Sequence, residues 1–125
     1  MTENELSNII VNTAYNIHVK LGPGLLESVY EEIMYYELKK QGLRIEKQKA
    51  IPVYWDKIKM PMGFRADLIV ENKVIIELKS VATIAPVHSK QLLTYLKITD
   101  LKLGLLINFN DKLIRNGITR IVNNL

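Results

Sequence analysis

The first 42 residues place apolar side chains at the three- and four-residue spacing of a helix. Thr2 and Glu5 have the spacing of a capping box, and the apolar face that follows consists of Leu6, Ile9, Ile10, Ala14, Ile17 and Leu21. The pair Gly22-Pro23 must end this helix. A second stretch, from near Gly24 to Gly42, repeats the spacing with Leu26, Val29, Tyr30, Ile33, Met34 and Leu38. We therefore expect two antiparallel helices.

After Gly42 the pattern changes to alternation or to continuous apolar runs, which predicts strands. Three such runs occupy residues 44–55, 64–70 and 73–79, with a turn after the first run at Asp56-Lys57. Strands that follow one another so closely predict a three-stranded antiparallel meander.

The last third of the chain returns to a helix and then to strands. Pro86 fits the first turn of a helix that runs through about Thr99, and residues 103–107 are a short buried strand. Asn116-Gly117 is typical of a hairpin and predicts strand pieces at 113–115 and 118–122, with a short helix at 111–115 as the alternative. The order is ααβββαβ plus a terminal hairpin or strand, an α/β fold around a sheet core.

Length and composition restrict the class of protein. The 125 residues are the length of one domain, so residues 1–125 are expected to share one core. No basic start precedes an apolar run and no apolar run is long enough to span a bilayer, so we expect no membrane association. The absence of cysteine excludes disulfides and thiolate zinc sites and fits the cytoplasm. A net charge of +4 mildly favours a polyanionic partner.

Charged residues interrupt the most apolar strand. Glu77 and Lys79 lie in a run that reads as buried on both faces, and as positions i and i+2 they share one face with Ile75. In the preceding strand Asp67 is flanked by apolar residues, and by the same alternation Arg65 and Ile69 share its face.

The turn between these strands predicts how they pair. A loop of residues 71–73 pairs Val70 with Val74, which would put Asp67 directly across from Glu77 with Cβ atoms roughly 5 Å apart. Two opposed carboxylates in an apolar setting destabilise a sheet unless a cation compensates them, and an oxygen-only site suits Mg²⁺ or Mn²⁺. A two-residue turn would separate the pair. The competing interpretation is a structural ion pair in which Lys79 or Arg65 neutralises an acid.

Several of these residues have the order and spacing of motifs in a known superfamily. Asp67 followed by Glu77-x-Lys79 resembles the PD-(D/E)xK nuclease superfamily, and Gly24-x-x-Glu27-x-x-Tyr30 is similar to the defining motif of the small GxxExxY family within it. Further segments that look like that family are Phe64-Arg65-Ala66-Asp67, Ala85-Pro86-Val87-His88 and Gln91-Leu92-Leu93-Thr94-Tyr95-Leu96-Lys97. Ala66 replaces the proline that names the superfamily.

The resemblance implies a restriction-endonuclease-like fold and assigns roles to the charged residues. Asp67 and Glu77 would bind the metal, Lys79 would orient the attacking water and stabilise charge on the phosphate, and Glu27 would be a further ligand. A structural role for Glu27, as an acid in the first turn of a helix, competes with this one.

The third predicted helix has a polar flank. His88, Gln91 and Tyr95 fall together at i, i+3 and i+7, and Gln91-x-x-x-Tyr95 is similar to a RecB-type exonuclease motif that supports the site and the DNA backbone. For His88 helix capping is the preferred interpretation. Arg65 and Tyr30 join the residues expected to support the site or bind nucleic acid. No role is assigned to the scattered aromatic residues Tyr15, Tyr35, Tyr36 and Trp55.

Together these patterns predict a Mg²⁺- or Mn²⁺-dependent nuclease that acts on DNA in preference to RNA. The alternative is a catalytically silent module on the same fold that binds nucleic acid or protein. Because a chain of this length leaves little surface for sequence recognition, we expect a homodimer or a partner to supply it.

Overall fold

A computed structural model describes residues 1–125. Its elements are α1 (Glu3–Leu21), α2 (Glu27–Lys40), β1 (Ile45–Ile51), β2 (Tyr54–Trp55), β3 (Ile58–Lys59), β4 (Phe64–Val70), β5 (Val74–Lys79), α3 (Pro86–Thr99), β6 (Leu103–Asn108), the 3₁₀ turn η1 (Ile114–Gly117) and β7 (Ile118–Val122). No helix is both long enough and apolar enough to cross a bilayer.

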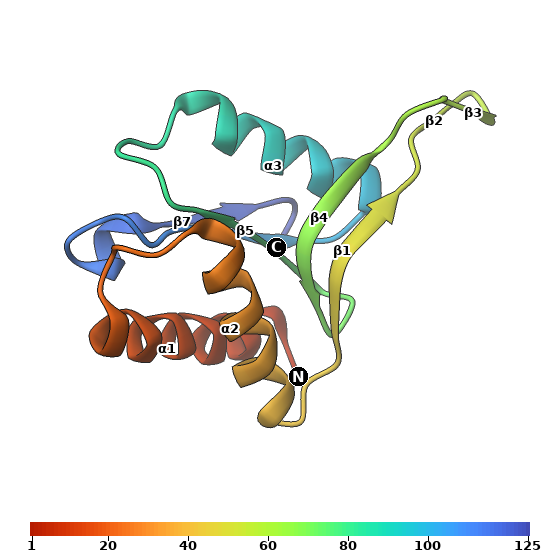
Figure 1. Cartoon of the computed structure of the whole chain (residues 1–125). Coiled ribbons are helices and arrows are strands. Elements are labelled where there is room, and N and C mark those ends of the chain that lie inside the picture. The colour runs from red at the N-terminus through yellow and green to blue at the C-terminus, as the bar shows by residue number, and fades with distance from the viewer.

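The molecule has three layers (Figure 1). A five-stranded sheet with the order β1-β4-β5-β6-β7 lies in the middle, α1 and α2 cover one face, and α3 covers the other. Strands β5 and β6 are parallel because α3 makes the crossover between them, and every other neighbouring pair is antiparallel. This is the mixed, restriction-endonuclease-like arrangement that the sequence predicts.

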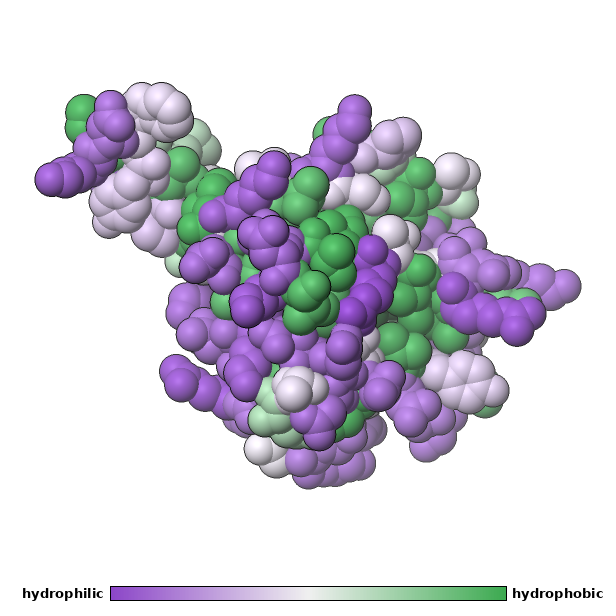
Figure 2. Space-filling model, turned by 180° about the vertical axis from the view of Figure 1, so that it is seen from behind, coloured by the Kyte–Doolittle hydropathy of each residue, from purple (hydrophilic) through white to green (hydrophobic).

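The first predicted strand is divided in two. Strand β1 ends at Ile51, before Pro52, which has no backbone N–H to donate to a ladder. Residues 54–55 and 58–59 then form a separate two-stranded ribbon around the predicted turn at Asp56-Lys57. We call residues 52–63 the arm. Seen from behind in Figure 2, it stands clear of the body of the molecule.

The second helix begins later than predicted, at Glu27 instead of Gly24. No side chain caps it at Leu26, whose backbone is extended. The hydroxyl of Tyr30, one turn into the helix, donates to the carbonyl of Gly22 and accepts from the amide of Leu25 at 3.2 Å. The connection between the helices is therefore held as an extended loop by a residue of the helix that follows.

The predicted hairpin at Asn116-Gly117 is wrong in its first half. Residues 114–117 form the 3₁₀ turn η1, and only the second piece, 118–122, is a strand. Gly117 lies where a Cβ would be 2.3 Å from the carbonyl oxygen of Asn108, so the tight approach of the turn to β6 requires glycine.

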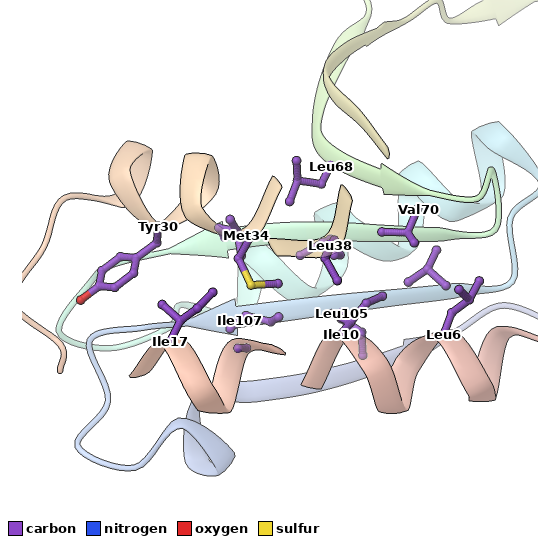
Figure 3. Packing of buried hydrophobic residues seen from close by; sticks show 14 of the residues in the cluster. Leu6, Ile10, Ile17, Tyr30, Met34, Leu38, Leu68, Val70, Leu105 and Ile107 are labelled. Atoms are coloured by element: carbon purple, nitrogen blue, oxygen red, sulfur yellow. The ribbon is translucent and has the colours of Figure 1, made fainter. Parts of the chain in front are cut away.

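Apolar side chains fill both faces of the sheet. Figure 3 shows α1 and α2 running in opposite directions, as predicted, over Leu68, Val70, Leu105 and Ile107. On the other face Leu92 and Leu96 of α3 pack on Ile75 and Leu106. Gly104 allows this approach, because a Cβ there would lie 2.9 Å from Cγ of Leu92. Strand β5 is thereby buried from both sides, and this environment surrounds Glu77.

Candidate active site

Strands β4 and β5 separate at the acidic residues. They pair as Val70↔Val74, Ile69↔Ile75 and Leu68↔Ile76, which confirms the predicted register. The pairing then stops, while β5 continues beside β6 as far as Lys79. In Figure 1, β4 bends away with β1 toward the arm. We call the opening between the strands the fork.

Asp67 lies where the fork begins. Its Oδ2 accepts a hydrogen bond of 2.8 Å from the backbone amide of Leu78. Asp67 and Glu77 were predicted to face each other as a regular pair of the β4–β5 ladder, but the backbone pairing ends before them. The Asp67 side chain bonds to the backbone of β5 instead. The two carboxylates are nevertheless neighbours, and the charge of Asp67 raises the pKa of Glu77.

A local distortion of β1 gives Asp67 a second partner. The β1–β4 pairing skips Gln48 and Asp67, and Gln48 has a left-handed φ of 52°. The Gln48 amide donates to Oδ1 of Asp67 at 3.3 Å and to the carboxylate of Glu31 on α2 at 2.6 Å. One side chain thus connects the fork to the helix layer.

The predicted face of Arg65 is wrong. Ala66 and Ile69 pack in one cluster beneath α3 although an odd number of positions separates them, so the alternation of faces shifts between them. Arg65 therefore does not share a face with Ile69. It is exposed, and its Nη1 donates to the carbonyl of Gln48 at 3.0 Å.

Glu77 is the most perturbed group in the protein. Its side chain is 9% exposed, and its Oε1 has no hydrogen-bond partner. Burial, followed by the nearby Asp67 carboxylate, raises the pKa of Glu77 to about 9, and Lys79 offsets only part of this. An unpartnered buried carboxylate oxygen is costly, so it calls for a ligand.

No cation of the chain forms an ion pair with these acids. The ion pairs of the structure are Lys40–Glu37, Lys47–Glu32 and Lys49–Glu46, all of them elsewhere. Lys79 is half-buried, and its ammonium lies within 4.0 Å of no carboxylate. The interpretation of Asp67 and Glu77 as a structural ion pair with Lys79 or Arg65 is therefore wrong.

Helix α2 contributes acids at the rim of the fork. Burial raises the pKa of Glu27, Lys79 lowers it, and Asp67 raises it further, so Glu27 lies within electrostatic reach of the predicted site. The predicted ligands Asp67, Glu77 and Glu27 do not, however, form a three-ligand cluster, since no three acidic or histidine side chains of the chain come close enough to bind one ion.

Glu31 was not predicted from the sequence, and the structure brings it to the same region. Burial raises the pKa of Glu31, and Asp67 raises it further. Its position four residues after Glu27, and so on the same face of α2, was the signal that could have identified it.

The polar flank of α3 divides into separate roles. The ring of Tyr95 stacks on that of Phe64 with centroids 3.7 Å apart, and burial, then Glu77 and Asp67, raise the pKa of its hydroxyl, which places Tyr95 beside the acids. His88 accepts a hydrogen bond of 3.3 Å from the Ala85 amide through Nδ1, which confirms its capping role. Gln91 is exposed, and its side chain makes no hydrogen bond within the chain.

Tyr30 supports the structure from within. It is fully buried and stacks on Phe109 with centroids 4.2 Å apart, so of its two predicted roles, supporting the site or binding nucleic acid, only the first is compatible with its position. Its hydroxyl fixes the loop that leads into Glu27. Asn108 was also not predicted; its buried side-chain amide bonds both backbone groups of Val81 and so fixes the loop after Lys79.

The donor set of the fork fits a divalent cation. Asp67 and Glu77 offer only oxygen, as Mg²⁺ and Mn²⁺ prefer, and Oε1 of Glu77 has an unfilled position. Two carboxylates are few protein ligands, which suits Mg²⁺ because it keeps much of its hydration shell. The position is where the β4–β5 pairing ends, within electrostatic reach of Glu27 and Lys79.

A mixed sheet covered on both faces, with acids at a fork between two of its strands, defines a protein of the restriction-endonuclease-like class. The family model described as the PD-(D/E)XK nuclease superfamily matches residues 4–121, so the chain belongs to this superfamily. No match was found among curated proteins or among solved structures.

Proposed function

We propose that this protein is a Mg²⁺- or Mn²⁺-dependent nuclease that hydrolyses phosphodiester bonds in DNA in preference to RNA. Membership of the superfamily supports the reaction class. The observation that carries the proposal for this chain is the buried Glu77, whose Oε1 has no partner beside a second carboxylate and no cation within ion-pair distance. Without an ion the cost of burial is met by protonation of Glu77, and a divalent cation would take the place of that proton.

Each residue of the fork has a proposed task. Asp67 and Glu77 bind the divalent cation, with Glu27 at the rim as a further ligand, direct or through water. The cation supplies a Lewis acid that stabilises charge on the phosphate and makes water a stronger nucleophile near neutral pH. Lys79, whose ammonium no carboxylate engages, binds the phosphate and orients the attacking water.

The residues around the acids position them. The Leu78 amide and Gln48 fix both oxygens of Asp67. Tyr95 lies next to the acids and stacks on Phe64. We propose that it bounds the α3 side of the fork and that its hydroxyl contacts the substrate backbone. Gln91, exposed on the same helix, extends this contact.

The test measures metal binding and DNA cleavage on the same preparation. Thermal melting with millimolar Mg²⁺ or Mn²⁺ should raise the midpoint, since an ion at a hundredfold excess over its Kd stabilises the folded state by about 2.7 kcal/mol. The same preparation is then incubated with linear, nicked, branched and single-stranded DNA and with RNA, each with and without metal.

Matched variants locate the activity. Lys79→Ala should abolish cleavage while the metal-dependent shift remains, and Glu77→Gln should abolish both. Lys102→Ala is the control, because Lys102 is exposed just before β6, at the end of the sheet away from Lys79. Cleavage that survives Lys79→Ala, or a melting midpoint that metal leaves unchanged, contradicts the proposal.

A silent binding module is the second candidate, and one observation favours it. The structure gathers no three-ligand cluster, so the chain has fewer metal ligands than the sequence predicts. This candidate predicts that DNA binds with no cleavage under any metal. Finer placement in the GxxExxY family rests on Gly24, Glu27 and Tyr30, of which Tyr30 has a clear structural task at the loop before Glu27.

A further inference from the structure

The arm is the most exposed apolar feature of the molecule. Trp55 is 71% exposed, Tyr54 57%, Ile58 65% and Met62 82%, and all four paired residues of the ribbon are exposed. Side chains of this size cost free energy when they remain in water, so a cluster of them on a projecting element marks an interaction surface.

The pairing of the ribbon sorts these side chains onto two faces. Residues paired across an antiparallel ribbon share a face, so Trp55 lies with Ile58, and Tyr54 lies with Lys59. One face is thus wholly apolar, while the other presents an aromatic ring beside an ammonium group. A ring beside an ammonium, as in Tyr54 and Lys59, can bind one nucleotide, because the ring stacks on the base and the ammonium contacts the phosphate.

Charge indicates the kind of partner. Lys57, Lys59 and Arg65 lie on the arm or at its root, and none of them forms an ion pair. Asp56 is the one acid between residues 49 and 65. An apolar surface surrounded by unpaired positive charge is complementary to a polyanion and repels a second copy of itself.

The arm is continuous with the fork. Strand β4 leaves the arm at Gly63 and reaches Asp67 within four residues, a distance of at most about 14 Å at the rise of a strand. Phe64, at the start of this path, stacks on Tyr95 beside the acids. A hollow of about 470 Å³ lies at the root of the arm between residues 50–52 and 59–65. A strand bound along β4 would therefore reach from the arm to the fork.

We propose that the arm binds DNA with unpaired bases, which stack on Tyr54 at one face of the ribbon and on Trp55 at the other, while Lys57 and Lys59 contact phosphates. The inference deepens the proposed function and rests on it for the identity of the substrate. Exposed aromatic rings favour unpaired bases because the faces of paired bases are already stacked. The arm thus selects single-stranded or frayed DNA and directs it to the fork.

Trp55 is the only tryptophan of the chain, so its fluorescence reports on the arm alone. In EDTA, where metal-dependent cleavage is suppressed, a single-stranded oligonucleotide should quench it, while a blunt duplex of the same sequence should not. Fluorescence anisotropy of labelled DNA then measures Kd, which Tyr54→Ala and Trp55→Ala should each raise about tenfold. The variant Lys57→Ala/Lys59→Ala should reduce the slope of log K against log salt by about 1.4.

The control is Tyr36→Ala/Lys102→Ala, which removes an exposed tyrosine and an exposed lysine outside the arm and should leave Kd unchanged. All the arm side chains to be replaced are exposed, so circular dichroism should show folded variants. Equal affinity for the blunt duplex, or arm variants with the wild-type Kd, overturns the proposal. So does a concentration-dependent change in Trp55 emission, accompanied by dimers in sedimentation, without DNA.

Turnover separates the two proposals. If DNA quenches Trp55 and binds through the arm, but the metal-loaded protein cleaves nothing, the arm is a DNA contact and the nuclease proposal is overturned. If the arm variants cleave single-stranded DNA with metal at the wild-type rate, the nuclease proposal stands and the proposed role of the arm is overturned.

Discussion

The carboxylate of Asp67 accepts a hydrogen bond of 2.8 Å from the backbone amide of Leu78, across the opening where β4 and β5 part. The Asp67 side chain thereby accepts a hydrogen bond from the Leu78 amide, which lies beyond the last backbone pair of β4 and β5. The bond joins the strand that carries Glu77 and Lys79 to the strand that carries Asp67. The geometry of the fork is therefore fixed by the protein before any ion binds.

Replacing Asp67 should separate its structural task from its charge. At pH 6, where Glu77 is protonated, Asp67→Ala should lower the free energy of unfolding by about 1–3 kcal/mol because it leaves the Leu78 amide without a partner. Asp67→Asn keeps an acceptor and should stay within about 0.5 kcal/mol of wild type. Urea unfolding measures both, and equal losses in the two variants would contradict the role of the bond.

Stability without metal should fall as the pH rises. The folded-state pKa of Glu77 is raised to about 9 from an ordinary value of 4.5, so the folded protein holds a proton that the unfolded chain releases. This contribution is complete below about pH 4.5 and is lost progressively as the pH approaches 9. Urea unfolding in EDTA between pH 5 and 9 should show the decline.

Glu77→Gln should remove most of that decline and raise the free energy of unfolding at pH 8 by about 1–4 kcal/mol. A small slope should remain because the pKa values of Glu27 and Glu31 are raised as well. A wild-type stability that is constant or rises with pH over this window would show that Glu77 does not titrate as described.

Binding of Mg²⁺ should strengthen with pH for the same reason. The ion and the proton compete for Glu77, so below its folded-state pKa the affinity should rise about tenfold for each pH unit. Isothermal titration calorimetry at pH 6.5, 7.5 and 8.5 in buffers of different ionisation enthalpy measures both the affinity and the protons released. Binding without proton release would place the ion away from Glu77.

Tyr30→Phe should lower the free energy of unfolding by about 1–3 kcal/mol. The variant keeps the ring stack on Phe109 but removes the hydroxyl that bonds Gly22 and Leu25. Urea unfolding measures the loss, with Tyr36→Phe as the control, because Tyr36 is 63% exposed and should change by less than about 0.5 kcal/mol. A Tyr30→Phe protein as stable as wild type would mean that the loop needs no such bond.

Gly104→Ala should destabilise the protein by about 1–3 kcal/mol, because its Cβ would lie 2.9 Å from Cγ of Leu92 and would push α3 from the sheet. Leu92→Ala alone leaves a cavity and should cost about 2–5 kcal/mol. The double variant should lose less than the sum of the two, which a double-mutant cycle measures. Strict additivity would contradict the contact.

The sequence predicts those features that depend on local signals. The three-residue turn at 71–73 sets the register of β4 and β5, and Pro86 marks the start of α3 at the observed residue. The acids are conspicuous because the run around Glu77 is otherwise apolar. These signals located both strands of the fork and the two acids that they carry, Asp67 and Glu77, but not Gln48 or Glu31.

The features that were missed depend on contacts between distant segments. Nothing around Gln48 signals a left-handed backbone inside a strand, and nothing in β4 signals the change of alternation that puts Ala66 and Ile69 on one face. The late start of α2 depends on bonds from the Tyr30 hydroxyl to the preceding loop, and the 3₁₀ turn at Gly117 depends on its packing against Asn108. Local propensity favoured another conformation at each place, and tertiary contacts overrode it.

The stacked rings of Tyr30 and Phe109 also close a long loop. They join α2 to the residue that follows β6, across nearly eighty residues of sequence. Closing a loop of this length costs conformational entropy before the contact repays it, so we expect α2 to dock on β6 later than it forms its own turns. The acids that this helix carries would then reach the fork late in folding.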